Sequence, residues 1–399
     1  RTEAFSFLNI LKRTMKYRTH RGLEISEVGV GCYALSGAYG SIDIRRFQQM
    51  LRQAHKKGVN FFDTAEGYGN AEKILGKTVK PFREEVYIAT KVGIREGITP
   101  NLSKTYIHDA CNRSLRQLDT HYIDLYQVHF DDPTTPVGET VNALEELVDQ
   151  GKIRHYGVGH LPKPRVEEYC KQGKPFSILM ELSAVARKSR NEILPLCNKY
   201  DIAGIGFSTT GRGILTGKYG PNTQFEADDL RSLDPLFQRA RFASALRIKS
   251  FFADLALNYD VTPVQLAVAW VLAQPKIICA LTGSSKIPHL EENLGASGIT
   301  FKQKDLNRLE EIFSKEDVRL ANDEQAIIHT ILTEPLPSSL EQAFIDLVYA
   351  LETSHDLGLL AEGLVRKIFT KLWLLKKKLN ETDRDALVAV QRDLNALLI

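Results

Sequence analysis

VNFFDTAEGYGNAEKILG, residues 59–76, passes from a strand to a loop to a helix within one short stretch. The apolar run that ends at the carboxylate Asp63 is typical of a short buried strand. Glycines on both sides of Tyr68 predict a loop, and helical periodicity follows from Asn70. In α/β folds the strand ends and the loops after them carry the chemistry. Asp63 and Tyr68 are therefore the first candidates for a functional site.

The same alternation of strand, loop and helix continues along most of the chain. A hairpin with a turn near Arg21-Gly22 comes first, and short apolar runs then alternate with segments of helical periodicity. Eight strands, each followed by helical sequence, predict an α/β fold, the (β/α)₈ TIM barrel. The expected strands are Val28–Gly31, Asn60–Asp63, Val86–Lys91, Ile123–His129, His155–Gly159, Ser177–Leu182, Ala203–Phe207 and Ile278–Leu281.

The alternation ends near Ala321, and the sequence beyond it holds helical patterns without convincing strands. We expect residues 15–320 to form the barrel and residues 321–399 to form an added all-α C-terminal extension. Residues 1–14 are an N-terminal extension with three open interpretations: a processing remnant, upstream sequence or a small amphipathic helix. The expected helices of the C-terminal extension are Asp323–Leu332, Ser338–Leu351, Gly358–Lys378 and Asp383–Leu398.

One segment of the C-terminal extension, LVRKIFTKLWLLKKKL at residues 364–379, has the pattern of a basic amphipathic helix. We expect this helix to pack within the extension and to expose its charged face to solvent. The alternative is that it binds a partner protein or lies on a membrane surface.

Composition excludes several classes of protein. A net charge of +3 with 25% charged residues does not indicate a protein that binds nucleic acid or a membrane surface. No apolar run reaches the roughly 18 residues that a membrane span needs. The five cysteines lack metal-ligand spacing, so we expect no metal site. Their isolation suits reduced thiols in a cytoplasmic protein.

Polar side chains also stand at the ends of the strands that follow Asp63. Lys91 ends the third expected strand and His129 ends the fourth. Taken singly, Asp63 could cap a turn, Lys91 could be a surface cation and His129 a satisfied core histidine. Together with Tyr68 they would converge at the carboxyl end of the barrel, where the sites of such barrels form. Lys91 follows the apolar run VYIAT and would be costly there unless Asp63 pairs with it.

This grouping predicts proton transfer. A tyrosine has an ordinary pKa near 10, too high for a ready acid or base near neutrality. We expect the Lys91 cation to favour the phenolate and so to lower the pKa of Tyr68. Tyr68 would then protonate a carbonyl oxygen or deprotonate an alcohol, with His129 orienting the same oxygen. None of these groups supplies a hydride, so the site requires a nicotinamide cofactor.

Several motifs occur together in this chain: GVNFFDTAEGYGNAEKILG, YIATKVG, SLRQLDTHYIDLYQVH, GKIRHYGVG, GRGILTGKY, PVQLAVAWVL and GSSKIPHLEENLGA. As a set they resemble the aldo-keto reductase family from about Met15 to Phe313 and leave the C-terminal extension uncovered. Within that family the chain is similar to the branch that includes microbial reductases and the beta subunits of voltage-gated potassium channels. The resemblance implies a catalytic tetrad of Asp63, Tyr68, Lys91 and His129.

The resemblance also implies contacts with a nicotinamide dinucleotide. Phe207 corresponds to the aromatic residue that stacks on the nicotinamide, and Ser208 and Lys218 match positions of the pyrophosphate loop. His160 and Glu181 take the positions that contact the carboxamide. The segment GSSKIPHLEEN matches the part that holds the adenosine phosphate and adenine, and its implied contacts are Gly283, Ser285, His289, Glu292 and Asn293.

Three positions depart from the family pattern. Gly159-His160 stands where Ser followed by Asn or Arg is usual, and Glu181 stands where Gln is usual. An ionised carboxylate can only accept hydrogen bonds. Near a 2′-phosphate His289 replaces Arg or Gln, yet Lys286 and His289 together still favour NADP(H) over NAD(H).

These residues predict the NAD(P)H-dependent, reversible reduction of an aldehyde or ketone to an alcohol, with Tyr68 as general acid or base. The alternative is a regulatory or scaffolding protein that binds NADPH and engages a partner or a second copy through residues 321–399. The sequence does not indicate which carbonyl compound is the substrate. Loop positions of the barrel suggest the pocket residues Tyr33, Tyr39, Phe130 and Arg212.

Overall fold

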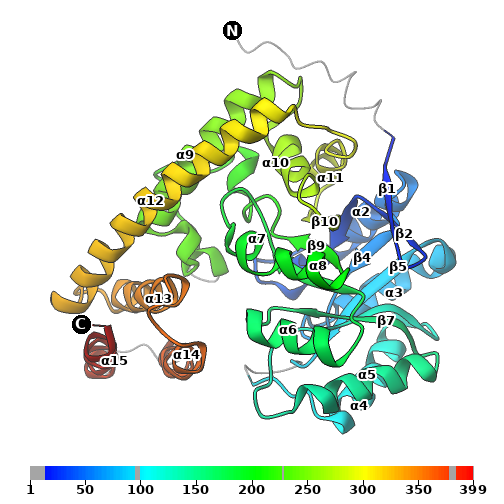
Figure 1. The fold of residues 1–399 in the computed structure, drawn as a ribbon, viewed down its shortest axis with the longest axis horizontal. Helices are drawn as coiled ribbons and strands as arrows, with labels where there is room; N and C mark the ends of the chain where they lie inside the picture. The colour runs from blue at the N-terminus through cyan, green and yellow to red at the C-terminus, as the bar shows by residue number, and fades with distance from the viewer. Residues whose placement is uncertain (1–13, 95–98, 227–228, 377–382, 399) are drawn as a thin grey trace. The chain divides into compact units, whose positions relative to one another are not determined.

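A computed structural model describes residues 14–94, 99–226, 229–376 and 383–398 of the chain (Figure 1). Eight parallel strands close into a barrel in the order β10-β3-β4-β5-β6-β7-β8-β9, which confirms the predicted fold class. Residues 1–13, and with them nearly all of the expected N-terminal extension, lie outside the described residues. The strands are β3 (Val28–Gly31), β4 (Phe61–Asp63), β5 (Tyr87–Val92), β6 (Ile123–Val128), β7 (Ile153–Gly159), β8 (Ser177–Glu181), β9 (Ala203–Phe207) and β10 (Ile277–Gly283).

The predicted N-terminal hairpin is present, with β1 (Tyr17–His20) antiparallel to β2 (Leu23–Ser26). Its two turn residues, Arg21 and Gly22, both have positive φ, as a two-residue turn between twisted strands requires. Leu23 and Ile25 of β2 pack in the same buried cluster as the interior side chains of the barrel. The hairpin therefore covers one end of the barrel and leaves the carboxyl ends of the strands for the site.

Helices follow the strands and pack side by side around the barrel. In α2 the buried residues Phe47, Met50, Leu51 and Ala54 recur at helical spacing, and the Asp43 side chain caps the first turn. The helices of this part are α2 (Ile44–Lys56), α3 (Ala71–Val79), α4 (Lys104–Leu118), α5 (Val137–Asp149), α6 (Lys163–Gln172), α7 (Lys188–Glu192), α8 (Leu194–Tyr200), α10 (Pro263–Leu272) and α11 (Ile287–Leu294). Most of helix α9 (Arg239–Leu257) belongs instead to the second compact unit described below.

Gly76, at the end of the opening stretch, shows how closely these helices approach. A Cβ atom at this position would lie 2.2 Å from the carbonyl oxygen of Leu118, the last residue of α4. Glycine is therefore required where α3 crosses the end of α4, because any side chain would collide with backbone.

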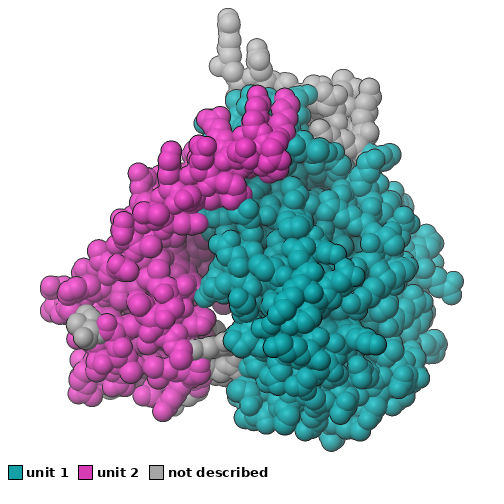
Figure 2. All heavy atoms as spheres, viewed as in Figure 1, with its two compact units in different colours: residues 1–219, 251–301 teal, residues 220–250, 302–399 magenta. Residues whose placement is uncertain are grey.

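The chain forms two compact units, coloured separately in Figure 2. Unit 1 comprises residues 1–219 and 251–301 and contains the barrel. Unit 2 comprises residues 220–250 and 302–399, so a segment from the middle of the chain folds with the C-terminal helices. The helices of the C-terminal part are α12 (Gln303–Thr333), α13 (Leu340–Asp356), α14 (Glu362–Lys376) and α15 (Arg384–Leu398).

Helix α12 runs without interruption through position 320, where the sequence pattern suggests a domain boundary. No glycine or proline occurs between Gln303 and Thr333, and the helix ends shortly before Pro335. The expected helix Asp323–Leu332 is thus the second half of a longer one.

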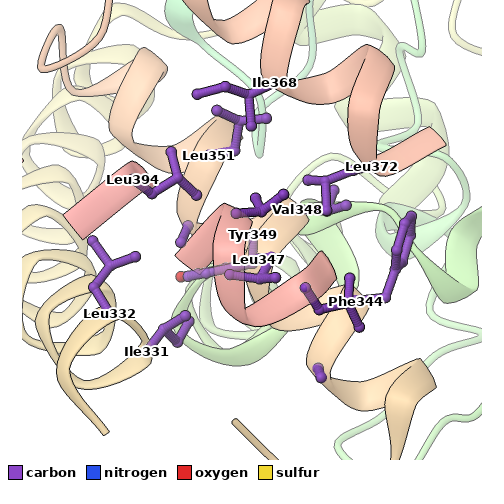
Figure 3. Close-up of a cluster of buried hydrophobic side chains, with 14 of the residues drawn as sticks. Ile331, Leu332, Phe344, Leu347, Val348, Tyr349, Leu351, Ile368, Leu372 and Leu394 are labelled. Atoms are coloured by element: carbon purple, nitrogen blue, oxygen red, sulfur yellow. The ribbon is translucent and has the colours of Figure 1, made fainter. Parts of the chain in front are cut away.

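Unit 2 has a hydrophobic core of its own (Figure 3). Leu347 and Leu351 of α13 pack with Leu332 of α12, Leu372 of α14 and Leu394 of α15. Helix α14 is the described part of the basic amphipathic segment and buries its apolar side in this core. The packed arrangement expected from the sequence is therefore the one observed, although residues 377–379 lie outside the described part. Among the described helices, none has the length and apolar character to cross a membrane.

Ion pairs join the middle segment of unit 2 to the C-terminal helices. The Arg241 guanidinium donates to Glu324 at 2.5 Å and to Asp356 at 2.8 Å. Two arginines of the same segment repeat the pattern: Arg239 pairs with Asp346 at 2.5 Å and Arg247 with Glu316 at 2.7 Å. Helices α12 and α13 thus provide carboxylates for arginines that precede them by many residues.

Arg241→Met should destabilise unit 2 by about 2 kcal/mol, because it leaves the buried Glu324 carboxylate without its cation. The effect should be smaller than for a fully buried pair, since Asp356 is partly exposed. Urea unfolding followed by circular dichroism measures it. The matched control is Lys371→Met, which breaks an exposed pair with Asp393 and should cost less than about 0.5 kcal/mol. Equal effects of the two variants would contradict this role for Arg241.

Candidate active site

The four side chains of the predicted tetrad lie together at the carboxyl ends of β4, β5 and β6. Asp63 is the last residue of β4, Lys91 is near the end of β5, and His129 directly follows β6. Tyr68 lies in the loop after β4. The Lys91 ammonium is 2.5 Å from an Asp63 carboxylate oxygen and 3.4 Å from the Tyr68 hydroxyl. The rings of Tyr68 and His129 are in edge contact, with centroids 5.6 Å apart.

Lys91 is held from several sides. Its side chain is 1% exposed, and it donates to the backbone oxygen of Thr64 at 2.8 Å as well as to Asp63. The Gln127 amide donates to the other Asp63 oxygen at 3.4 Å. Gln127 was not predicted as a site residue. It lies two positions after Leu125 and two before His129, so all three point to the same side of β6, toward the barrel interior. That alternation is the signal that could have found it.

Burial, and not the Lys91 cation, has the largest effect on the pKa of Tyr68. Burial raises the pKa of Tyr68 well above 10, and the negative charge of Asp63 acts in the same direction. The expectation that Lys91 lowers this pKa is therefore wrong for the arrangement observed here. Asp63 lies closer to Lys91 than Tyr68 does, so the Asp63 carboxylate neutralises most of the positive charge of Lys91 before it can act on the Tyr68 hydroxyl.

His129 is a neutral imidazole near pH 7. Burial lowers its pKa well below the usual 6.5, and the nearby Lys91 cation adds to this effect. Its Nδ1 atom is buried and has no hydrogen-bond partner among the described residues. A neutral ring keeps one N–H donor and one acceptor, so His129 can bind an oxygen without changing its charge.

Aromatic rings form a continuous row at these strand ends, from Tyr39 to Phe207. The predicted pocket residues Tyr33, Tyr39 and Phe130 belong to this aromatic row, and so do Tyr68, His129 and His160. The ring centroids are 5.5 Å apart for Tyr39–Tyr33, 5.0 Å for Tyr33–Tyr68, 5.6 Å for Tyr68–His129, 4.4 Å for His129–Phe130, 4.8 Å for Phe130–His160 and 4.6 Å for His160–Phe207.

The remaining predicted pocket residue, Arg212, pairs with Glu181. Its guanidinium lies 3.0 Å and 3.1 Å from the two carboxylate oxygens of Glu181, the last residue of β8. Glu181 is the register partner of Phe207 on β9, so the ion pair stands beside the end of the aromatic row. Burial, Lys91 and Arg212 all lower the pKa of His160, although the residue as a whole keeps exposed surface.

The loop after β9 has a backbone suited to phosphate. Residues in the left-handed region turn successive N–H groups toward one side of a loop, which makes an anion-binding concavity. The predicted contact Ser208 has such a backbone, and the predicted contact Lys218 is an exposed cation at the end of the loop. The positive φ values are 53° at Ser208, 60° at Gly211, 51° at Arg212, 100° at Gly213 and 84° at Gly217.

The end of the neighbouring strand β10 presents the other predicted contacts. Gly283 is exposed, and among the described residues no atom beyond its two chain neighbours lies within 4 Å of the place that a Cβ would take. Helix α11 opens shortly after it, and the free N–H groups of a helix N-terminus favour an anion. Ser285 and Glu292 are half-buried, His289 is exposed and Asn293 is buried. Two groups of donors on adjacent strands thus fit the phosphates of a dinucleotide. The described residues contain no cluster of three or more His, Cys, Asp or Glu side chains that could hold a metal.

Comparison with known proteins agrees with the family resemblance seen in the sequence. The sequence model of the aldo/keto reductase family matches residues 27–314. "Probable aldo-keto reductase 1" of Glycine max is 34% identical over 306 residues, which is 75% of this chain and 88% of that protein. The "NADH-specific methylglyoxal reductase" of Escherichia coli (strain K12) is 31% identical over 312 residues, covering 73% and 95% of the two chains.

Solved structures share the fold. The glycerol dehydrogenase AKR11B4 from Gluconobacter oxydans superposes with a TM-score of 0.69 at 28% identity, covering 76% of this chain and 95% of that one. An aldo/keto reductase from Klebsiella pneumoniae, solved with NADP and acetate, gives 0.58 at 24% identity, with coverage of 75% and 96%. The Klebsiella pneumoniae structure thus shows the fold alone, whereas the Escherichia coli relative is named as specific for NADH.

Proposed function

Because this chain belongs to the aldo/keto reductase family, we propose that it reduces an aldehyde or ketone to an alcohol with a reduced nicotinamide dinucleotide. The observation that carries the proposal is the grouping of Tyr68, Lys91 and Asp63. The Tyr68 hydroxyl lies 3.4 Å from an ammonium that a buried carboxylate holds in place. A phenol beside a fixed cation is suited to give up a proton at the moment when a carbonyl oxygen becomes negative.

In this mechanism Tyr68 donates its proton to the carbonyl oxygen, and Lys91 stabilises the charge that then develops on the phenol. The neutral His129 holds the same oxygen by a hydrogen bond. A reduced nicotinamide dinucleotide, held by Phe207 and the loop after β9, would supply the hydride for the carbonyl carbon. The C=O double bond thus becomes a C–O single bond with a new C–H and a new O–H bond, and Tyr68 recovers its proton from water.

The phosphate-binding candidates support NADP(H) rather than NAD(H) as the cofactor. Lys286 and His289 are exposed at the start of α11, where a 2′-phosphate would meet both a helix N-terminus and a cation. Phe207 offers a ring for the nicotinamide at the end of β9. The free thiols of all five cysteines support a cytoplasmic location.

The test is the oxidation of NADPH by the purified protein when an aldehyde is added, with the alcohol identified as product. NADH in place of NADPH should give a lower kcat/KM. Absence of any alcohol from a panel of small, aromatic and branched aldehydes and ketones would overturn the proposal.

The pH dependence of the rate should follow the raised pKa of Tyr68. Reduction needs the protonated phenol, which persists to a higher pH when the pKa is raised, so kcat should stay level up to about pH 9. Alcohol oxidation needs the phenolate and should speed up as the pH rises. Profiles in both directions measure this. A fall of the reduction rate with a midpoint below pH 8 would mean that Lys91 lowers the pKa of Tyr68 after all.

A further inference from the structure

Glu66 is a buried carboxylate in the loop that carries Tyr68, and it has no part in the proton transfer proposed above. It stands two positions before Tyr68, and its side chain is 4% exposed. Its Oε1 atom accepts hydrogen bonds from the Gly93 backbone N–H at 2.9 Å and from the Tyr106 hydroxyl at 3.0 Å. Gly93 follows β5, the strand of Lys91, and Tyr106 lies on α4. One carboxylate thus joins the tyrosine loop to the end of β5 and to a helix.

Helix α4 also supplies the positive charge that compensates Glu66. Arg113 is seven positions after Tyr106 and therefore lies on the same face of the helix. Its guanidinium is 3.5 Å from the Oε2 atom of Glu66 and 5.3 Å from the centroid of the Tyr106 ring. Oε2 accepts no hydrogen bond from the described residues, so Arg113 provides charge, whereas the bonds to Oε1 fix the position of the side chain.

The backbone around Glu66 lies directly against β5 and the residues that continue it. The Glu66 N–H donates to the backbone oxygen of Lys91 at 3.4 Å. A Cβ atom at Gly67 would lie 2.7 Å from the backbone oxygen of Ile94, so no side chain fits between the two segments. The residue that precedes Tyr68 is thus held against the chain that continues from Lys91.

We propose that Glu66 is a positioning residue that sets the distance between the Tyr68 hydroxyl and the Lys91 ammonium, an inference that rests on the proposed function. Glu66 touches neither substrate nor cofactor and acts through Tyr68. The hydroxyl and the ammonium are 3.4 Å apart. A displacement of about 1 Å at a reacting group can cost about 10²-fold in rate. The length of the Glu66 side chain is therefore decisive, because Oε1 must reach the Gly93 N–H from a fixed backbone.

Two conservative substitutions separate the length of this side chain from its charge. Glu66→Gln keeps an oxygen that can take the place of Oε1 and should leave kcat within about threefold of the unmodified protein. Glu66→Asp keeps the charge but is one methylene shorter, and kcat should fall by about 10- to 10²-fold. The assay uses NADPH and the aldehyde of the test panel that the unmodified protein reduces fastest. Each rate is divided by the concentration of NADPH-binding sites from fluorescence titration, so unfolded protein does not count.

A double-variant cycle with Tyr68→Phe shows whether Glu66 acts through the tyrosine. Glu66→Asp should lower the residual kcat of the Tyr68→Phe protein by less than about twofold, because the hydroxyl that it misplaces is already absent. A general distortion of the barrel would instead lower kcat by the same factor in both backgrounds. Hydrogen exchange of the Gly93 amide tests the contact independently of turnover, since Glu66→Asp should accelerate this exchange and Glu66→Gln should not.

The matched control is Glu72→Asp, the same shortening at another buried carboxylate. Glu72 accepts a hydrogen bond from the Thr90 hydroxyl at 2.6 Å and lies on α3, beyond the tyrosine loop, so kcat per binding site should change by less than about threefold.

Normal kcat in Glu66→Asp would overturn the inference and leave the proposed function standing. An equal loss in Glu66→Gln or in Glu72→Asp would do the same, and so would an equal factor in the two backgrounds of the cycle. An unmodified protein that reduces no carbonyl compound would overturn both.

Discussion

Tyr68→Phe is expected to lower kcat for carbonyl reduction by about 10²- to 10⁴-fold. The variant keeps the ring, which contacts Tyr33 and His129 edge-on, and removes only the hydroxyl that faces Lys91 at 3.4 Å. Without that hydroxyl no group of the tetrad can give a proton to the carbonyl oxygen, because His129 is neutral and Lys91 is committed to Asp63. Steady-state kinetics with NADPH measures the loss, and fluorescence titration should show nearly unchanged NADPH binding.

Tyr200→Phe is the matched control for this prediction. It removes a hydroxyl that donates to Glu167, outside the tetrad and the aromatic row, and kcat should change little. A Tyr68→Phe protein with normal kcat would show that the proton comes from another group. A simultaneous loss of NADPH binding would indicate a role in cofactor binding instead.

Lys91→Met is expected to lower the free energy of unfolding by about 3–5 kcal/mol and to abolish reduction. The Lys91 side chain is 1% exposed, and the Asp63 carboxylate that it neutralises is 7% exposed. The variant leaves a buried carboxylate without a cation. Its pKa, which burial already raises, should then rise further. Because the folded variant binds a proton more tightly than the unfolded chain, its stability should increase as the pH falls. Urea unfolding at several pH values measures this.

The double variant Lys91→Met/Asp63→Asn separates stability from catalysis. It removes both charges of the pair, so most of the lost stability should return while the reaction remains blocked. The matched control for Lys91→Met is Lys80→Met, which breaks an exposed pair with Asp119 and should leave the free energy of unfolding unchanged within error. If the double variant is no more stable than Lys91→Met alone, the buried charge is not the cause of the destabilisation.

Local patterns were sufficient for most of the barrel. The expected strands Val28–Gly31 and Ala203–Phe207 agree with the structure at both ends. Each element of this fold packs mainly with its neighbours in sequence, so the periodicity of apolar residues within it already reflects its surroundings. The positions of Asp63, Lys91 and His129 followed from the same argument, because parallel strands bring their carboxyl ends to one side.

Contacts between residues far apart in the sequence could not be predicted from such local patterns. The sign of the Tyr68 pKa shift depends on how deeply the ring is buried and on Asp63 lying nearer to Lys91, which no spacing reveals. The pairing of Arg212 with Glu181 joins two different strand ends. The partners of Arg241 lie on helices that the sequence treats as a separate extension.

The discontinuity of unit 2 also bears on how this protein folds during synthesis. Arg241 and its partner Asp356 are 115 positions apart in the chain. At about 5–20 residues per second, the ribosome adds Asp356 about 6–23 s after Arg241. For most of that interval residues 220–250 are made, while helices α12 and α13, which provide the carboxylates for their arginines, are not both complete. This middle segment therefore waits for its folding partners during synthesis, and translation pauses within α12 or α13 would prolong its exposure.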